Sequence, residues 1–370
     1  MQRVNGLRIF HGAAVALMLG SAWLGSARAE SLADHANRGL VELVTGGDAA
    51  SIAMAQDLAS VIDDGETRRL LPVIGRGAIE NLVDVKLLHG IDLGVVQLDA
   101  LESARDTTMP HLDGSITYVA KLHNEELHIL APAETKQLAD LAGKNVELVG
   151  GAKITAAAAF DLLHIRIQPV FDEEAVALAK LKSGDVAAMA YVAAKPSLPR
   201  ELQRDAGGLH FVPVPFNQAM ASRYVPAQLT SDDYPDLVGG SAGVDTIAVG
   251  MVLVAANLTP KTERYQNVAN FVDTFFTDLP RLQEQTHHPK WREVNVAADL
   301  QGWRRFPPAD AWLKRNVVAA APPVDQQELR DIFARFLDER AKAAGSQTLT
   351  AEQKDQLFDQ FQRWQHGKPH

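Results

Sequence analysis

Three short loops stand directly before predicted helices, and two of them are rich in glycine. The loops are residues 45–48, 76–78 and 151–155. The first turn of a helix presents backbone N–H groups without partners and a partial positive charge, and both favour a bound carboxylate. Glycine lets a ligand approach the backbone closely. Turn geometry alone explains one such loop, but three at matching strand ends predict a binding site for a small molecule.

Side chains in these loops offer charges of both signs. Arg76 can hold a carboxylate through a bidentate fork, or it is a solvated loop arginine. Asp48 would repel an anion, so it caps the following helix, pairs with Arg76 or holds a ligand ammonium. Lys153 supplies charge to an anionic ligand or stays in solvent. The candidate ligand contacts from the loops and helix starts are Thr45, Gly46, Gly47, Asp48, Ser51, Arg76, Gly77, Gly151, Lys153 and Thr155.

Three further candidates lie on or after predicted buried strands. Gln97 and Asp99 follow the apolar run LGVV, and polar side chains in that position must find partners. Each of the two either contacts a ligand or braces its loop, and we expect one of each. Tyr191 lies within the apolar run VAAMAYVAA, where it is either a core tyrosine with one bonded hydroxyl or a pocket wall.

Metal binding and catalysis have little support in the sequence. His123, Glu126 and His128 alternate on what we interpret as adjacent strands, whereas a metal site needs three or four convergent ligands. There is no nucleophile elbow, no phosphate loop and no Ser/His/Asp order. We therefore expect no metal, no cofactor and no enzymatic activity. A hydrolase would require a buried acid–base pair in the binding cleft.

The loops are positioned by repeated strand–helix units, which predict an α/β fold with parallel sheets. The first block alternates from residue 40, and a second block with the same pattern begins near residue 131. Residues 244–257 read as a long strand that returns to the first block. We expect lobe I to comprise 38–130 with 245–322, lobe II to comprise 131–244, and a ligand cleft between them.

The first 29 residues read as a signal peptide. Arginines precede a short apolar stretch and an A-x-A site, so we expect cleavage after Ala29 and export to the periplasm. The chain has no cysteine and a net charge of −10, and removing Arg3, Arg8 and Arg28 gives −10 − 3 = −13. A surface this acidic argues against a nucleic-acid partner.

The last third of the chain is predicted to add helices to the α/β body. A helix is expected over 262–283, followed by an irregular segment over 286–323 whose tryptophans pack on the back of lobe I. Capping signals and apolar stripes predict a helical hairpin over 324–366, within an extension that begins at residue 323. Its apolar stripes are buried either on the body or against a protein partner.

The order of short motifs over residues 40–260 resembles the TAXI-class solute-binding receptors of tripartite ATP-independent periplasmic (TRAP) transporters. The matching segments are the turn Thr45-Gly46-Gly47, GRGAIENL at 75–82, the spaced Gly90, Asp92, Gln97 and Asp99, DLAGKNV at 140–146, SGDVAA at 183–188, and a strand that ends near Pro196. Two stretches depart from the family pattern. ASIA at 50–53 lacks two aromatic residues, and GGAKIT at 150–155 replaces a hydroxyl-rich loop.

The resemblance implies a type 2 periplasmic-binding-protein fold, in which two lobes close over one small carboxylate or amino-acid-like molecule. It also implies membrane transporter subunits as partners. The alternative is a binding-protein scaffold that has been repurposed as a periplasmic interaction or assembly factor. A filled or collapsed cleft would favour that alternative.

Overall fold

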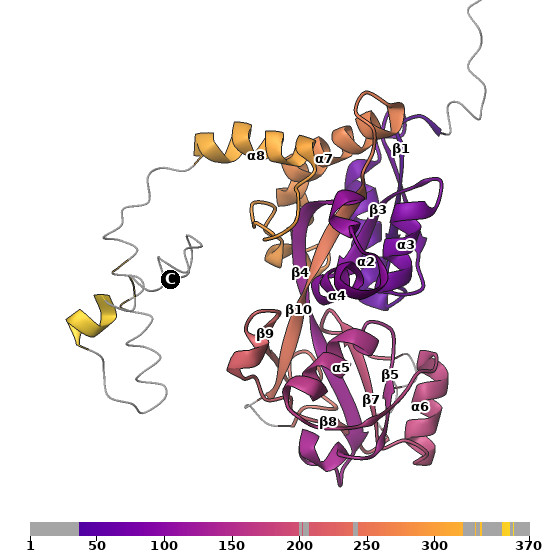
Figure 1. The fold of residues 1–370 in the computed structure, drawn as a ribbon, viewed down its shortest axis with the longest axis vertical. Helices are drawn as coiled ribbons and strands as arrows, with labels where there is room; N and C mark the ends of the chain where they lie inside the picture. Colours follow the sequence, from indigo (N-terminus) through magenta and orange to yellow (C-terminus); the bar gives the residue numbers. More distant parts are fainter. Residues whose placement is uncertain are drawn as a thin grey trace, which may run out of the picture.

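The computed structural model describes residues 37–199, 202, 207–239, 243–320, 330, 334, 350–355 and 358. The predicted signal peptide lies outside these residues, and so does nearly all of the predicted C-terminal hairpin. The described chain forms two α/β lobes stacked along the long axis (Figure 1). No helix within it has both the length and the apolar character needed to cross a bilayer.

One 10-stranded sheet runs through both lobes in the order β2-β1-β3-β10-β4-β7-β5-β6, with β8 paired to β4 and β9 paired to β10. The strands of lobe I are β1 (Leu40–Thr45), β2 (Arg69–Ile74) and β3 (Ile91–Gln97). Those of lobe II are β5 (Asn145–Leu148), β6 (Gln168–Val170), β7 (Ala188–Ala193), β8 (Leu209–Phe211) and β9 (Tyr224–Leu229). The long strands β4 (Ile116–Pro132) and β10 (Val244–Ala256) belong to both.

The two lobes repeat one strand arrangement. β1 pairs in parallel with β2 and β3, and β5 pairs in parallel with β6 and β7. β10 joins β3 and β4 joins β7, both antiparallel. The same order of second, first and third strand therefore occurs twice, with two antiparallel strands between the halves. This is the α/β, type 2 periplasmic-binding-protein-like architecture that the sequence predicts.

Helices flank the sheet in both lobes, and all of them except α4 and α8 were predicted from the sequence. Those of lobe I are α2 (Ala49–Ile62), α3 (Ala78–Leu87), α4 (Leu98–Ser103), α7 (Glu263–Leu282) and α8 (Pro307–Ala320), and those of lobe II are α5 (Ala152–Leu162) and α6 (Glu174–Ser183). The buried stripe of α7 includes Phe271, Phe275 and Leu282, which join the lobe I core. Fully burying one such side chain contributes about 1.5–3 kcal/mol, so α7 is a main support of this lobe.

The expectation of an irregular chain over 286–323 was wrong in one part, because α8 occupies residues 307–320. This helix begins with Pro307 and Pro308, in a segment that is rich in Trp, Arg and Pro. Proline is tolerated in the first helical turn, where its missing N–H would have no partner. The predicted packing of the tryptophans is confirmed for Trp291 and Trp303, which are 2% and 7% exposed within lobe I.

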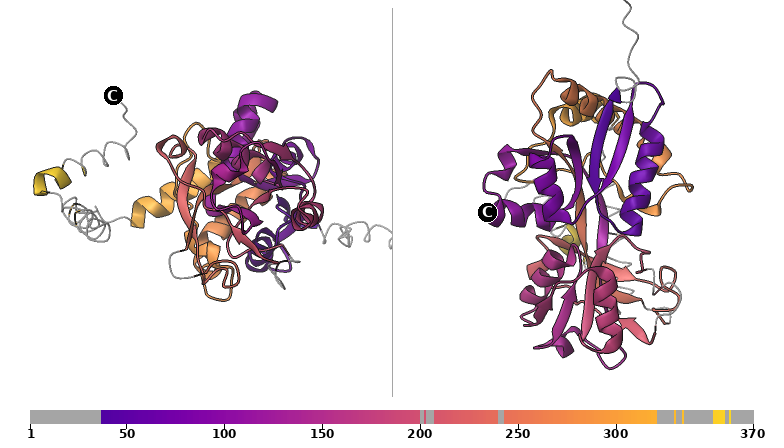
Figure 2. Two further views of the ribbon diagram at one scale, coloured as in Figure 1. Left: turned by 90° about the horizontal axis from the view of Figure 1, so that it is seen from below. Right: turned by 90° about the vertical axis from the view of Figure 1, so that its right-hand side faces the viewer.

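The expectation that His123, Glu126 and His128 lie on adjacent strands was also wrong, because all three lie on β4. Val119 and Leu122 of this strand pack in a lobe I core, whereas Leu127 packs in a lobe II core. The polar run between them falls at the waist, where β4 and β10 pass between the lobes (Figures 1 and 2).

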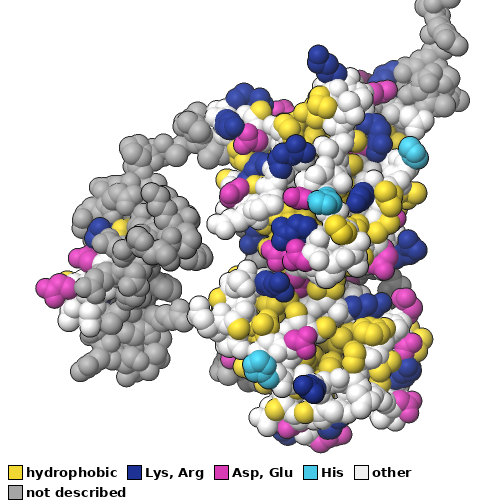
Figure 3. All heavy atoms as spheres, viewed as in Figure 1, with side chains coloured by type: hydrophobic (Ala, Val, Ile, Leu, Met, Phe, Trp, Pro, Cys, Tyr) yellow, Lys and Arg dark blue, Asp and Glu magenta, His cyan; other side chains and the backbone are white. Residues whose placement is uncertain are grey.

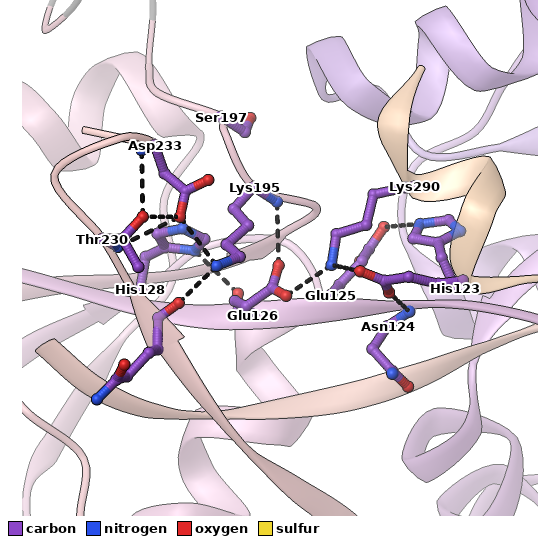
Figure 4. A network of polar contacts seen from close by, with 12 residues as sticks. His123, Asn124, Glu125, Glu126, His128, Lys195, Ser197, Thr230, Asp233 and Lys290 are labelled. Carbon is purple, nitrogen blue, oxygen red and sulfur yellow. Dashed lines mark hydrogen bonds and ion pairs between the residues drawn. The ribbon is translucent and has the colours of Figure 1, made fainter. Parts of the chain in front are cut away.

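At this waist, the buried carboxylate of Glu126 connects the two lobes (Figure 4). Its Oε1 accepts a hydrogen bond from Lys290 Nζ of lobe I at 2.6 Å, and its Oε2 accepts one from the backbone N–H of Lys195 of lobe II at 3.0 Å. Lys195 Nζ in turn bonds Asp233 at 2.9 Å and the Gln228 carbonyl at 2.7 Å. Glu126 and Lys290 are each only 3% exposed.

We predict that Lys290→Met lowers the free energy of unfolding by about 3–5 kcal/mol, because it leaves Glu126 buried without its cation. Urea unfolding measures the loss. The control is Lys314→Met, which breaks a pair whose side chains are 72% and 46% exposed and should cost less than about 1 kcal/mol. Equal effects of the two substitutions would contradict the assigned role of Lys290.

Candidate functional site

A cleft of about 500 Å³ lies between the lobes and receives loops from both. The loop before α2 and the loop before α3 come from lobe I, and Gly150 and Gly151 before α5 come from lobe II. These loops follow the carboxyl ends of β1, β2 and β5, and open α/β sheets bind ligands at such strand ends. The three predicted loops therefore share one cavity.

Most of the predicted contacts line this cleft, and four do not. The lining residues among them are Gly46, Gly47, Asp48, Ser51, Arg76, Gly77, Gln97, Gly151 and Tyr191. Thr45, Asp99, Lys153 and Thr155 lie outside the lining. Thr45 lines a separate cavity of about 20 Å³ inside lobe I, and Lys153 is exposed.

The first loop is held by Asp48, which caps α2. Its Oδ1 accepts hydrogen bonds from the backbone N–H groups of Ala50 at 3.1 Å and Ser51 at 3.0 Å. Of the roles that the sequence left open, helix capping is the one with bonds in the structure. The same carboxylate lines the cleft, so its charge also acts on whatever enters there.

The second loop requires glycine for steric reasons. A Cβ added at Gly75 would lie 1.9 Å from Oδ1 of Asn81, and Gly77 has φ +141°, which side chains rarely adopt. Arg76 between them is exposed and lines the cleft. Asn81 also lines the cleft, and its Oδ1 is a buried acceptor without a hydrogen-bond partner among the described residues.

The lobes touch beside the cleft through Gln97 and Gly151. A Cβ added at Gly151 would lie 2.1 Å from Nε2 of Gln97, so only glycine fits against the end of β3. Gln97 is 3% exposed and lines the cleft. Its position therefore suits a ligand contact, one of the two roles considered for it.

Asp99, in contrast, braces the two lobes. Its Oδ2 accepts hydrogen bonds from Thr155 Oγ1 at 2.8 Å and from the Tyr224 hydroxyl at 2.9 Å, both in lobe II. Burial raises the pKa of Asp99. These bonds connect α4 to α5 and β9, away from the cleft lining.

Tyr191 combines the two roles that the sequence left open. It is buried, its hydroxyl donates to the Ser197 carbonyl at 3.1 Å, and its ring stacks on His128 with centroids 4.6 Å apart. The residue nevertheless lines the cleft. It offers a ligand a rigid aromatic wall.

Glu125 was not among the predicted site residues, yet it lines the cleft from the middle of β4 and is 3% exposed. Burial raises its pKa well above the ordinary value, and the charges of Asp48 and Glu126 raise it further, whereas Lys290 and a hydrogen bond from Gln97 lower it. The signal in the sequence was a polar run, HNEE, inside an otherwise apolar stretch. Glu173 and Glu174 at the start of α6 also line the cleft and were missed.

His123 is the candidate for an acid–base partner of Glu125. Its Nε2 lies 3.6 Å from Oε1 of Glu125, too far for a hydrogen bond, and burial lowers the pKa of His123 to about 4. The imidazole is therefore neutral at neutral pH and neutralises no charge on Glu125. No cluster of three or more metal-ligating side chains occurs in the described part of the chain.

No protein-family model and no curated protein matches the chain. Similar solved structures include the periplasmic aliphatic sulphonate-binding protein of Escherichia coli, at 16% identity over 85% of this chain and 91% of that chain with a TM-score of 0.39. An amino acid ABC transporter substrate-binding protein of Streptococcus pneumoniae bound to L-arginine is 13% identical over 70% and 95%, with a TM-score of 0.40. The GluR0 ligand-binding core of Nostoc punctiforme in complex with L-glutamate is 14% identical over 69% and 99%, with a TM-score of 0.41. Likenesses of this size carry no conclusion about ligand or partner, and the fold of this chain rests on its own strand order.

The raised pKa of Glu125 predicts a pH effect on stability. The folded protein retains a proton that the unfolded chain releases near pH 4.5, so stability falls as the pH rises from there through the folded pKa. Glu125→Gln removes this contribution. The urea midpoint of the variant should therefore rise relative to that of the wild type as the pH increases. Exposed Glu284→Gln is the control and should keep the wild-type slope. Identical slopes for wild type and Glu125→Gln would show that Glu125 is already ionised in the folded protein.

Proposed function

We propose that this chain is a periplasmic solute-binding protein. It captures one small ligand, amino-acid-like or anionic, between its two lobes. Residues in the loops of both lobes contact the ligand, and binding shifts the population toward a closed form. We further propose that the chain is exported by its signal peptide and that the closed form docks on the membrane subunits of a TRAP-type transporter.

The open cleft is the observation that carries the proposal. Its volume of about 500 Å³ falls in the range of small-molecule sites, and both lobes contribute glycine loops to it. Helix starts from each lobe offer backbone N–H groups, and Arg76 offers a guanidinium at the exposed side. A ligand binds the closed state more tightly, because only in that state can it contact the loops of both lobes at once.

The type of transporter rests on the motif order over residues 40–260. The alternative, an interaction factor without transport, is not favoured by any contact among the described residues, and the open cleft counts against it. A pull-down tests this alternative. It would be supported by a protein partner that is retained with or without ligand, and only when residues 324–366 are present.

We predict that filling the cleft abolishes ligand binding without unfolding the protein. Gly47→Trp places an indole in the cleft, where a Cβ at this position has only Ile74 within 4 Å, at 3.4 Å. A screen of amino acids, dicarboxylates and sulfonates by thermal shift and calorimetry identifies a ligand on the wild type. A ligand at 100-fold excess over its Kd stabilises the folded state by about 2.7 kcal/mol, and Gly47→Trp should lose this gain.

Gly114→Trp is the matched control, since a Cβ there has no atom within 4 Å and the residue is outside the cleft lining. It should keep both the ligand and the stabilisation. Failure of every compound to bind at millimolar concentration would count against a solute-binding function. Undiminished binding by Gly47→Trp would show that the ligand binds outside this cleft.

A further inference from the structure

Glu125 is a buried carboxyl group that faces the cleft without a bonded cation. Its Oε1 has no hydrogen-bond partner among the described residues. The two nearest basic groups do not serve it, because His123 is neutral and Lys290 Nζ is bonded to Glu126 at 2.6 Å and Glu293 at 2.8 Å. In Figure 4 the dashed line from Glu125 leads to His123, at 3.6 Å, whereas the bonds of Lys290 are directed to other carboxylates. Buried polar atoms usually have a hydrogen-bond partner, so this unpartnered oxygen requires an explanation.

Gln97 adds a second acceptor at the same place. Its Oε1 is buried and has no hydrogen-bond partner among the described residues, and Gln97 and Glu125 both line the cleft. The hydrogen bond from Gln97 to Glu125 leaves Oε1 of each residue without a donor, and a ligand group that donates several hydrogen bonds would satisfy both oxygens. A protonated amine supplies three donors and a positive charge, and that charge favours release of the proton that Glu125 retains in the folded protein.

The other charged side chains of the cleft also favour a positively charged ligand group. Among the described lining residues the acidic side chains are Asp48, Glu125, Glu173 and Glu174, and the one basic side chain is Arg76. Arg76 is exposed, whereas Glu125 is 3% exposed and close enough to Asp48 for the charge of Asp48 to raise the pKa of Glu125. Acidic and basic side chains are interspersed over both lobes in Figure 3, so that face has no broad field of one sign.

We propose that the ligand carries a protonated amine, which sits between the carboxylates of Glu125 and Asp48 and donates to Gln97. This deepens the proposed solute-binding function and depends on it. It selects amino acids and amines from the broader ligand class, and it excludes simple dicarboxylates and sulfonates. An amino acid bound in this way can direct its carboxylate to Arg76 and the helix starts, which are the anion-friendly parts of the cleft.

Ligand pairs that differ only in the amine test the proposal on the purified protein. L-glutamate is compared with glutarate, L-alanine with propionate, and 1,4-diaminobutane with butane-1,4-diol, by calorimetry at neutral pH. We expect at least one amine-bearing member to bind, and at least tenfold more tightly than its amine-free partner. An amine-free compound that binds as tightly as its partner overturns this inference and leaves the solute-binding function standing. Failure of every compound, after the wider screen has also failed, contradicts the solute-binding function itself.

Two variants then assign the amine to its residues. Glu125→Gln keeps the shape of the side chain and should weaken binding of the amine-bearing ligand at least tenfold. Asp48→Asn keeps a good helix cap and should also weaken it. Glu284→Gln removes one charge outside the cleft and should bind as the wild type does. Unchanged affinity in both Glu125→Gln and Asp48→Asn, with folding verified by circular dichroism, rules out this seat for the amine.

Discussion

The structure depends on one constraint: two strands must pass from one hydrophobic core into another. β4 contributes apolar side chains to a core in each lobe, and between the cores it carries four polar residues, His123 to Glu126. His123, Glu125 and Glu126 of this segment are each 3% exposed and therefore shielded from water. Each polar side chain there needs a partner. For Glu126 the partners are Lys290 and Lys195, one from each lobe.

The contacts across the lobes fix the width of the cleft. Glu126 connects the lobes at the strands, Asp99 connects α4 to Thr155 of α5 and to Tyr224 of β9, and Gln97 abuts Gly151. The contact of Gln97 with Gly151 joins β3 of lobe I to a glycine loop of lobe II, so any rotation of one lobe against the other must alter it. A ligand that contacts loops of both lobes can bias such a rotation.

Much of this architecture could be predicted from local patterns in the sequence. The alternation of strands and helices, the capping by Asp48 and the glycine loops depend on residues close together in the chain. The polar run on β4 could not be placed in the same way, because the sequence does not tell a strand that crosses between lobes from two short strands. Glu125 was missed for that reason. Gln97 and Asp99 follow the same strand, and only the fold determines which faces the cleft and which reaches Thr155. For α8, two prolines hid a helix that they in fact begin.

The cleft contains groups that favour a negative charge and groups that favour a positive charge. How strongly each acts on a ligand depends on how deeply it is buried. The helix starts and Arg76 favour negative charge, but Arg76 is exposed and screened by water. Glu125 is buried where screening is weak, so a cation beside it favours the ionised carboxylate over the protonated form that burial favours. A ligand that is only anionic would satisfy the outer groups and bring its charge toward the inner carboxyl group. A ligand with an amine at one end and a carboxylate at the other satisfies both. Its orientation is then fixed, with the amine toward Glu125 on β4 and Asp48, and the carboxylate toward Arg76 in the loop before α3.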